Sequence, residues 1–168
     1  MNKLERVQHK IFTQSDLLKQ VIIWRFQGKK IVFTNGCFDI LHLGHIDYLA
    51  GAASLGNILI IGLNSDASVS RLKGEHRPIT GEQSRAMVLA SLSFVDAVVL
   101  FEEETPYNLI SAVVPDILVK GGDYPPETVV GSDVVTAHGG KVIILPFIPG
   151  YSTSAIEEKI LLAGKIKN

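Results

Sequence analysis

Hydrophobic residues occur in two patterns that alternate along the whole chain. Five short segments are rich in Val, Ile and Leu, as buried β-strands are; they span residues 30–34, 57–63, 95–101, 116–120 and 141–147. In the other segments, hydrophobic residues recur at the three- and four-residue spacing of a helix; these span residues 15–26, 43–55, 82–92, 106–113, 127–137 and 155–163. Strands without a polar face are typical of parallel sheets that are covered on both sides. The pattern therefore predicts an α/β fold, with a doubly wound, parallel, five-stranded sheet and helices on both faces.

One region interrupts this alternation without dividing the chain. Residues 71–81 contain Lys73-Gly74 and Arg77-Pro78 and show no hydrophobic period, so we expect a polar loop there. No linker, internal repeat or low-complexity tract separates two parts of the sequence. We therefore expect a single domain over residues 1–168, with a helical lead at 1–28 and the core at 29–168.

The composition narrows the class of protein. The 168 residues are 46% hydrophobic and carry 16 Lys and Arg against 17 Asp and Glu, for a formal net charge of −1. These values exclude a disordered tail and leave no basic excess of the kind that wraps nucleic acid. The hydrophobic runs are shorter than the ~18 residues of a membrane span, and the N-terminus lacks the apolar segment of a signal peptide. The single cysteine, Cys37, cannot form an internal disulfide, so we expect a soluble cytoplasmic protein.

The predicted sheet indicates where a ligand would bind. In doubly wound folds, ligands bind beyond the carboxyl ends of the strands, near the point where the strand order reverses. Four loops follow such strand ends, at residues 35–45, from 64 onward, at 120–124 and at 147–154. Because polar residues and glycines are concentrated in these loops, we expect the functional site there.

The loop at 35–45 carries the densest set of chemical groups. It ends with His42 and His45, three residues apart, with Gly44 between them at the start of a predicted helix. On one helical turn the two imidazoles would share a face, beside the unpaired N–H groups and the positive dipole end that attract phosphate. Gly36 would allow a tight turn, and Gly44 would leave room for a ligand or another backbone. This segment therefore predicts a phosphate-binding site.

Other interpretations of the same loop are open. The histidines could be purely structural, or half of a transition-metal site, although no third or fourth ligand is evident, and we predict no metal ligand in the protein. Cys37 could be a nucleophile, but no Asp or Asn is positioned by the sequence to complete a triad, which favours packing or a backbone contact. A carboxylate at Asp39 would repel phosphates, so we expect it to cap the helix or to hold the loop.

The segment Gly36-Cys-Phe-Asp-Ile-Leu-His-Leu-Gly-His45 resembles the signature of the HxGH nucleotidyltransferase superfamily, in particular of its cytidylyltransferase-like branch. The four-residue pattern alone is weak, but here it follows a strand, opens a helix and has Phe38-Asp39 upstream. The resemblance continues at residues 70–74, 77–79, 119–124, 145–147 and 150–153, where the chain is similar to the adenylyltransferases of ADP-heptose synthesis. These occur fused to a heptose kinase or free-standing, and the length of this chain leads us to expect the free-standing form.

The resemblance implies a Rossmann-like nucleotidyltransferase fold and a reaction. AMP would pass from ATP, with Mg²⁺, to D-glycero-β-D-manno-heptose 1-phosphate, giving ADP-heptose and pyrophosphate for a lipopolysaccharide core or related glycan. The implied catalytic residues are His42, His45 and Lys73, and the implied contacts to the substrate phosphate are Lys73, Arg71 and Arg77. The implied nucleotide-binding residues are Asn35, Gly36, Cys37, Phe38, His42, Gly44, His45, Gly121, Asp123, Ser152 and Thr153. Simpler roles stay open: solvated charges at Arg71 and Arg77, a turn at Asp123, and a helix cap at Ser152 or Thr153.

Two other functions are left open by the sequence. A cytidylyltransferase for glycerol 3-phosphate or ethanolamine phosphate would share the fold, but that group carries an Arg-Thr-Glu-Gly-Ile-Ser-Thr type of motif where this chain has Phe147-Ile-Pro-Gly-Tyr-Ser-Thr153. A non-catalytic nucleotide-binding regulator is the second alternative, and the intact His42, His45 and Lys73 argue against it. A Rossmann dehydrogenase is excluded because no Gly-x-Gly-x-x-Gly follows the first strand.

The expected partners are small molecules, ATP and a sugar 1-phosphate, and neither nucleic acid nor a membrane. The mean hydropathy of +0.27 is high for a small chain. A well-covered parallel sheet or a buried interface between copies would account for it. We expect a homo-oligomer, and specifically a dimer.

Overall fold

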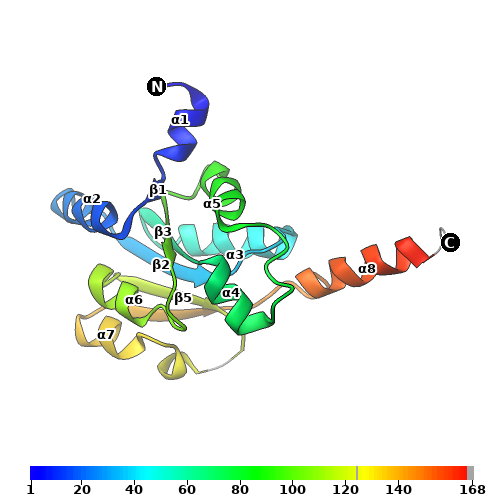
Figure 1. Ribbon diagram of the computed structural model, residues 1–168. Helices are drawn as coiled ribbons and strands as arrows, with labels where there is room; N and C mark the ends of the chain where they lie inside the picture. Colours follow the sequence, from blue (N-terminus) through cyan, green and yellow to red (C-terminus); the bar gives the residue numbers. More distant parts are fainter. Residues whose placement is uncertain (124, 166–168) are drawn as a thin grey trace.

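The computed structural model describes residues 1–123 and 125–165, and in them a parallel sheet with the strand order β1-β4-β3-β2-β5-β6 (Figure 1). The strands are β1 (Ile11–Phe12), β2 (Ile31–Gly36), β3 (Ile58–Asn64), β4 (Ala97–Phe101), β5 (Ile117–Gly121) and β6 (Lys141–Leu145). Every pairing is parallel. The predicted doubly wound α/β fold is confirmed, but the predicted number of five strands is wrong, because the sheet has six.

The helices cover both faces of this sheet. They are α1 (Lys3–Gln8), α2 (Gln14–Phe26), α3 (Leu43–Ala53), α4 (Asp66–Lys73), α5 (Glu82–Ser91), α6 (Tyr107–Val113), the 3-10 turn η1 (Pro126–Thr128), α7 (Ser132–Ala137) and α8 (Thr153–Lys165). Hydrophobic residues of α2, α6 and α7 form one core with alternate residues of the strands, and residues of α3 and α5 form the other. On β2, for example, Phe33 belongs to the first core and Val32 to the second, and both are fully buried. The strands are apolar on both sides because each side faces a layer of helices.

The sixth strand, β1, is short and lies at one edge of the sheet. Ile11 pairs with Val98 and Phe12 with Val99 of β4. Two residues are too few to show the alternation by which a strand is detected in a sequence. The first 28 residues are therefore part of the sheet and its cover, since Leu17 and Val21 of α2 also lie in the core.

Several helix boundaries differ from the sequence prediction, and three of these differences have a clear local cause. The helix expected from Ser15 begins at Gln14, because the Thr13 side chain accepts a hydrogen bond from Asp16 N and caps it. The polar loop expected over 71–81 is wrong for its first three residues, which belong to α4 and precede Gly74. The helix expected over 127–137 is divided into η1 and α7, because Val129 is extended and Gly131, the N-cap residue of α7, has a φ of 85°.

The strand order reverses at β2. From β2 the chain adds β3 and then β4 on one side, and it later returns to add β5 and β6 on the other. The carboxyl ends of β2 and β5 are therefore adjacent, and the loops that follow them diverge to form an opening. Figure 1 shows that α8 leaves the body on this side of the sheet, whereas α1 projects from another part of the molecule. Within the described residues, the helices are too short or too polar to cross a lipid bilayer.

Candidate functional site

A hollow of about 160 Å³, called here the first hollow, opens at the carboxyl ends of β2 and β5. It lies where the strand order reverses, as the fold class predicts. Its lining comes from β2 and its loop, α3, α4, β5 and the segment that leads into α8: Asn35, Gly36, Cys37, Phe38, Asp39, His45, Tyr48, Lys73, Lys120, Gly121, Phe147 and Thr153. The structure thus brings together residues separated by more than a hundred positions in the chain.

The two histidines lie against each other at the start of α3. His42 is the N-cap residue of that helix, and its ring stacks on the ring of His45 with centroids 3.8 Å apart and planes inclined by 21°. Gly44 makes this stacking possible, because a Cβ atom there would lie only 3.1 Å from the His42 ring and 3.3 Å from Tyr151. The space predicted beside Gly44 is occupied, in this structure, by the imidazole of His42.

Phe38 packs against the ring of His45. It is buried, with a φ of 45°, and its ring meets the His45 ring edge to face, with centroids 5.4 Å apart. The prediction that Gly36 provides the tight turn is wrong, since Phe38, and not Gly36, adopts the left-handed conformation. Gly36 instead leaves space for the Phe38 ring, which would lie 3.0 Å from a Cβ atom at position 36.

Both imidazoles are disposed to be uncharged near neutral pH. Burial, together with the nearby His42 and Lys73, lowers the pKa of His45 to about 4. Burial also lowers the pKa of His42. The Nδ1 atoms of both rings are buried, and a backbone hydrogen bond to Ile40 partly opposes the lowering of the His45 pKa. Because the Nδ1 atoms are enclosed by protein, a ligand in the first hollow would contact another part of each ring.

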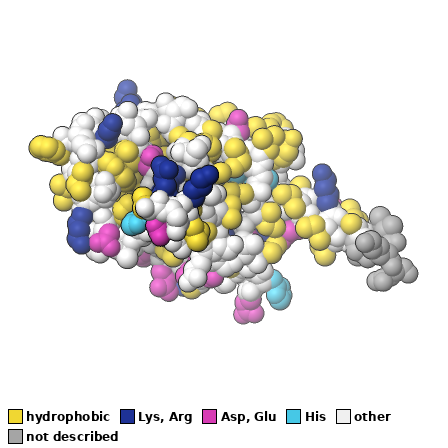
Figure 2. All heavy atoms as spheres, turned by 90° about the horizontal axis from the view of Figure 1, so that it is seen from above, with side chains coloured by type: hydrophobic (Ala, Val, Ile, Leu, Met, Phe, Trp, Pro, Cys, Tyr) yellow, Lys and Arg dark blue, Asp and Glu magenta, His cyan; other side chains and the backbone are white. Residues whose placement is uncertain are grey.

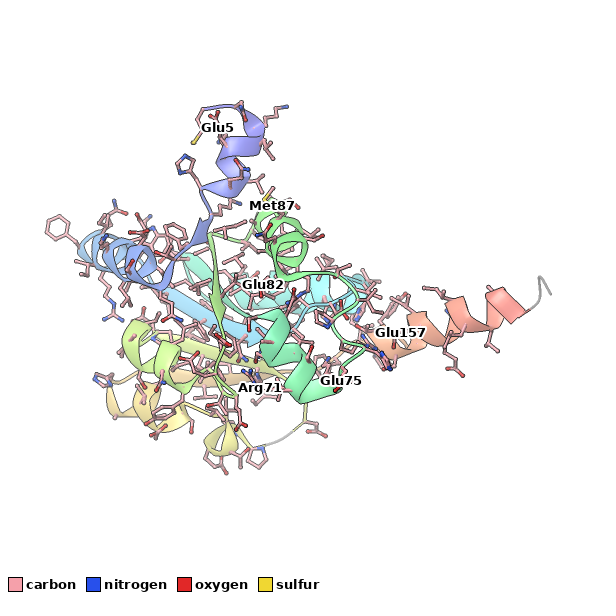
Figure 3. All side chains as sticks on the ribbon, in the orientation of Figure 1. Glu5, Arg71, Glu75, Glu82, Met87 and Glu157 are labelled. Atoms are coloured by element: carbon pink, nitrogen blue, oxygen red, sulfur yellow. The ribbon has the colours of Figure 1, made fainter. Side chains whose placement is uncertain are left out.

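Helix α4 sends only one of its two basic residues to this site. Lys73 lines the first hollow, whereas Arg71 lines a separate groove and donates a hydrogen bond to the Glu102 carbonyl. Residues two apart on a helix point to different sides, so they cannot both face one ligand. Figure 3 shows Arg71 on α4. The structure therefore does not bring Arg71 to the predicted phosphate contact.

Arg77 is also held away from the first hollow. Its guanidinium pairs with Asp39 at 3.0 Å and with Glu157 of α8. Figure 3 shows Glu157 where α8 leaves the body of the molecule. Arg77 thus connects the loop after β2 to the C-terminal helix. In this structure its guanidinium forms ion pairs with two carboxylates and does not face the first hollow.

Asp39 holds the loop, as the sequence predicts. Its carboxylate accepts hydrogen bonds from the backbone N–H groups of Ile79 and Thr80, each at 2.9 Å, as well as from Arg77. Burial by itself would raise the pKa of Asp39, but these hydrogen bonds keep that pKa below its usual value. The carboxylate is therefore a fixed anion of the loop structure and not a free acid.

Arg85 is a second organising residue, which sequence reasoning missed. Its side chain is buried on α5 and donates hydrogen bonds to the carbonyls of Cys37 and Thr80 and to the carboxylate of Asp66. It therefore ties the loop after β2 to the loop before α5 and to α4. A lone arginine in an amphipathic helix gives no sequence signal for such a role, because its partners lie 19 and 48 residues away.

The predicted residues of the last two loops differ in their positions. Gly121 and Thr153 line the first hollow, but Asp123 and Ser152 are exposed and outside its lining. The Ser152 hydroxyl accepts a hydrogen bond from Ala155 N, which is a helix-capping role. Gly121 allows the Phe147 ring to cover it, since a Cβ atom there would lie 2.4 Å from that ring.

Lys120 is a further lining residue that was not among the predicted ones. Its ammonium donates a 2.8 Å hydrogen bond to Asn35 Oδ1. It also lines a neighbouring space of about 400 Å³, called here the second hollow. The second hollow is lined by Asn35, Gly36, Cys37, Asn64, Leu72, Glu104, Thr105, Pro106, Lys120, Thr128, Val129 and Val130. A lysine at the end of a hydrophobic strand is a usable signal, since charged residues are expensive to place there without a function.

The side chains around the first hollow are poor ligands for a resident metal ion. Within the described residues, no three His, Cys, Asp or Glu side chains are grouped so that they could hold one. The carboxylate of Asp39, which lines the first hollow together with His45, is already engaged by two N–H groups and a guanidinium. The residues present do not fit a metal site built by the protein alone.

Comparison with known proteins agrees with this geometry. Residues 33–159 match the model of the family described as cytidylyltransferase-like. Similar curated proteins are named bifunctional protein HldE: that of Pelobacter propionicus is 58% identical over 135 residues, 80% of this chain and 28% of the relative. That of Wolinella succinogenes is 56% identical over 153 residues, 91% of this chain and 31% of the relative. The chain thus spans about 30% of the length of these relatives.

A solved structure is similar in the same region. It is titled a lipopolysaccharide core biosynthesis protein, from Thermoplasma volcanium, and it has 32% sequence identity and a TM-score of 0.57. The match covers 72% of this chain and 98% of that one. The matched family model includes the whole of the first hollow, from the loop after β2 to the start of α8. The chain belongs to the cytidylyltransferase-like family.

Proposed function

We propose that this protein transfers AMP from ATP to D-glycero-β-D-manno-heptose 1-phosphate and releases pyrophosphate. The observation that carries the proposal is the stacked pair His42 and His45 at the start of α3, where His45 and Lys73 line the first hollow. The identity of the acceptor is supported by relatives named HldE and by the similar structure of a lipopolysaccharide core biosynthesis protein.

The reaction requires positioning and charge stabilisation. An oxygen of the acceptor phosphate attacks the α-phosphorus of ATP, the bond from that phosphorus to the oxygen bridging to the β-phosphate breaks, and pyrophosphate leaves with that oxygen. No covalent intermediate with the protein is needed. Negative charge on the phosphoryl oxygens is stabilised by fixed N–H donors and cations, which is the usual source of rate enhancement in such transfers.

The described residues have the chemistry for these roles. The imidazoles of His42 and His45 offer N–H groups, and the exposed ammonium of Lys73 can follow the phosphates as they move. With ring centroids 3.8 Å apart, two imidazolium ions would repel each other, which opposes protonation of both rings at once. Thr153, at the start of α8, faces the same hollow and adds a hydroxyl.

Mg²⁺ enters this proposal as part of the substrate Mg·ATP. Magnesium is commonly held by substrate phosphates and water with few protein ligands. This agrees with the donor set of the site, which has no metal cluster among the described residues. The cytoplasmic location expected from the sequence stays a prediction.

The test is an assay of pyrophosphate release from the purified protein. We expect turnover with ATP and the heptose 1-phosphate. His42→Ala should lower kcat about a hundredfold, because removing one preorganised donor raises the barrier by roughly 3 kcal/mol. His9→Ala, at an exposed histidine after α1, is the matched control and should leave turnover unchanged.

Two results would contradict the proposal. Turnover with CTP and glycerol 3-phosphate alone would assign the protein to the cytidylyltransferase alternative. Nucleotide binding without turnover of either pair, unchanged by His42→Ala, would favour a non-catalytic regulator.

A further inference from the structure

Lys120 lies at the wall between the two hollows. It is the last residue but one of β5, and the adjacent residue on β2 is Asn35, which accepts its hydrogen bond. Both residues line both hollows. The lysine therefore reaches the point at which a molecule in one hollow would meet a molecule in the other.

The ammonium of Lys120 has no counter-ion within the described residues. Its hydrogen-bond acceptor is the neutral amide oxygen of Asn35, its titratable neighbour is the thiol of Cys37, and none of the ion pairs among the described residues includes it. The residue is half-buried, and burial lowers its pKa. A partly desolvated cation without an anion is unfavourable. A ligand that supplies a negative charge would therefore be stabilised next to Lys120.

The chemistry of the two hollows indicates which ligand this is. The first hollow already has Lys73 and His45 for a triphosphate. Among the described residues that line the second hollow, Lys120 is the only basic one, and the rest include side chains that suit hydroxyl groups: Asn64, Glu104, Thr105 and Thr128. One cation with several neutral or acidic hydrogen-bonding groups matches a polyhydroxylated molecule that carries a single phosphate.

We propose that the second hollow binds the sugar-phosphate acceptor, and that Lys120 pairs with the acceptor's phosphate and holds it at the wall next to the nucleotide. In this position the attacking oxygen would approach a phosphate held in the first hollow. Positioning of this kind is a large part of catalysis when two bound substrates react. The inference rests on the proposed function for the identity of the sugar, but the role of Lys120 depends only on the acceptor's phosphate.

The experiment is calorimetric titration of D-glycero-β-D-manno-heptose 1-phosphate and, separately, of ATP into the whole chain. Lys120→Met keeps the length of the side chain and removes its charge, and it should weaken heptose 1-phosphate binding roughly 10- to 100-fold while ATP binding is unchanged. Lys120→Arg should restore most of the affinity. Lys141→Met, at an exposed lysine on β6, is the matched control.

A second variant and a second measurement separate binding from folding. Glu104→Ala changes an exposed residue and should also weaken heptose 1-phosphate binding and not ATP binding. Lys120→Met should melt at or above the wild-type temperature, because it removes a charge from a partly buried place. A lower melting temperature together with equal losses for both ligands would mean that Lys120 is only structural and would overturn the inference.

The remaining outcomes distinguish this inference from the proposed function. Turnover by the wild type with heptose 1-phosphate binding unaffected in Lys120→Met would overturn the inference and leave the function in place. Binding lost in Lys120→Met, but no turnover by the wild type, would support the inference and reject the function. If the wild type does not bind heptose 1-phosphate at all, both are rejected.

Discussion

At the scale of single residues, the central contact is that of His42 with His45 across Gly44. Gly44 is a helical residue, and its missing side chain lets the N-cap imidazole fold back over the first turn. Phe38 then closes the other side of His45. The two rings are therefore held in place by packing before any ligand arrives.

The buried state of His45 predicts a pH dependence of stability. Its pKa is about 4 in the folded chain, against 6.5 for an unperturbed histidine. Between these values the unfolded chain binds a proton that the folded chain does not, so the free energy of unfolding should fall as the pH is lowered from about 6.5 to 4. The contribution of this residue is at most about 3 kcal/mol, from 1.36 kcal/mol for each pKa unit.

Urea unfolding at several pH values measures this effect. His45→Gln should show a shallower loss of stability than the wild type over the same range, because the side chain no longer titrates. Equal slopes for the two proteins would show that His45 is not the responsible group.

At the scale of elements, the loop of residues 74–81 is fixed by charged side chains from elsewhere. Asp39 accepts hydrogen bonds from its backbone, Arg85 donates to its Thr80 carbonyl, and Arg77 extends from it to Asp39 and Glu157. The loop connects α4, which carries Lys73, to α5. Its anchors therefore set where Lys73 stands relative to the histidines.

Asp39→Asn tests this anchoring. The amide keeps the size of the carboxylate but presents an NH₂ group to N–H donors, which leaves a buried partner unsatisfied. We expect the free energy of unfolding to fall by roughly 3 kcal/mol, as is typical when one partner of a buried ion pair is removed, and turnover to fall as well.

Thermal unfolding and the pyrophosphate assay measure the two effects. Asp47→Asn, at an exposed carboxylate on α3, is the matched control and should change neither. If Asp39→Asn retains wild-type stability, Asp39 does not anchor the loop.

At the scale of the whole molecule, the C-terminal helix stands away from the body. Figure 1 shows α8 projecting from the sheet, and Figure 2 shows hydrophobic side chains that continue onto this projection. Ile160, Leu161 and Leu162 are 63%, 67% and 54% exposed. Consecutive exposed hydrophobic residues on a projecting helix are typical of a surface that associates with another. The expected dimer stays a prediction, and α8 is the element on which to test it.

Light scattering coupled to size exclusion measures the mass in solution. We expect the wild type to be a dimer and the double variant Ile160→Glu, Leu161→Glu to be a monomer, because charges cannot be buried in such an interface without a partner. Ser154→Glu, exposed near the start of α8, is the control that should remain dimeric. A wild type that is monomeric at micromolar concentration would contradict the expectation.

Local patterns were enough to predict the fold class and the strand ends at which the candidate site lies. The hydrophobic strands are apolar because helices cover both faces, and the loop with His42 and His45 follows the strand at which the order reverses. Both features depend on residues that are contiguous in the chain, so they can be predicted from the sequence. The two-residue strand β1 was missed, because so short a segment has no period.

Contacts between residues that are distant in the sequence became visible only in the folded chain. Arg71 and Lys73 look equivalent in the sequence, but α4 turns them to different sides, and Arg77 is paired with Asp39 and Glu157. The roles of Lys120 and Arg85 follow from hydrogen-bond partners that lie 85 and 48 residues away in the sequence. The order of residues is enough to show which groups could bind phosphate, since that depends on residue type and local geometry. The packing of the chain decided which of them meet, because hydrogen bonds and ion pairs depend on distance in space.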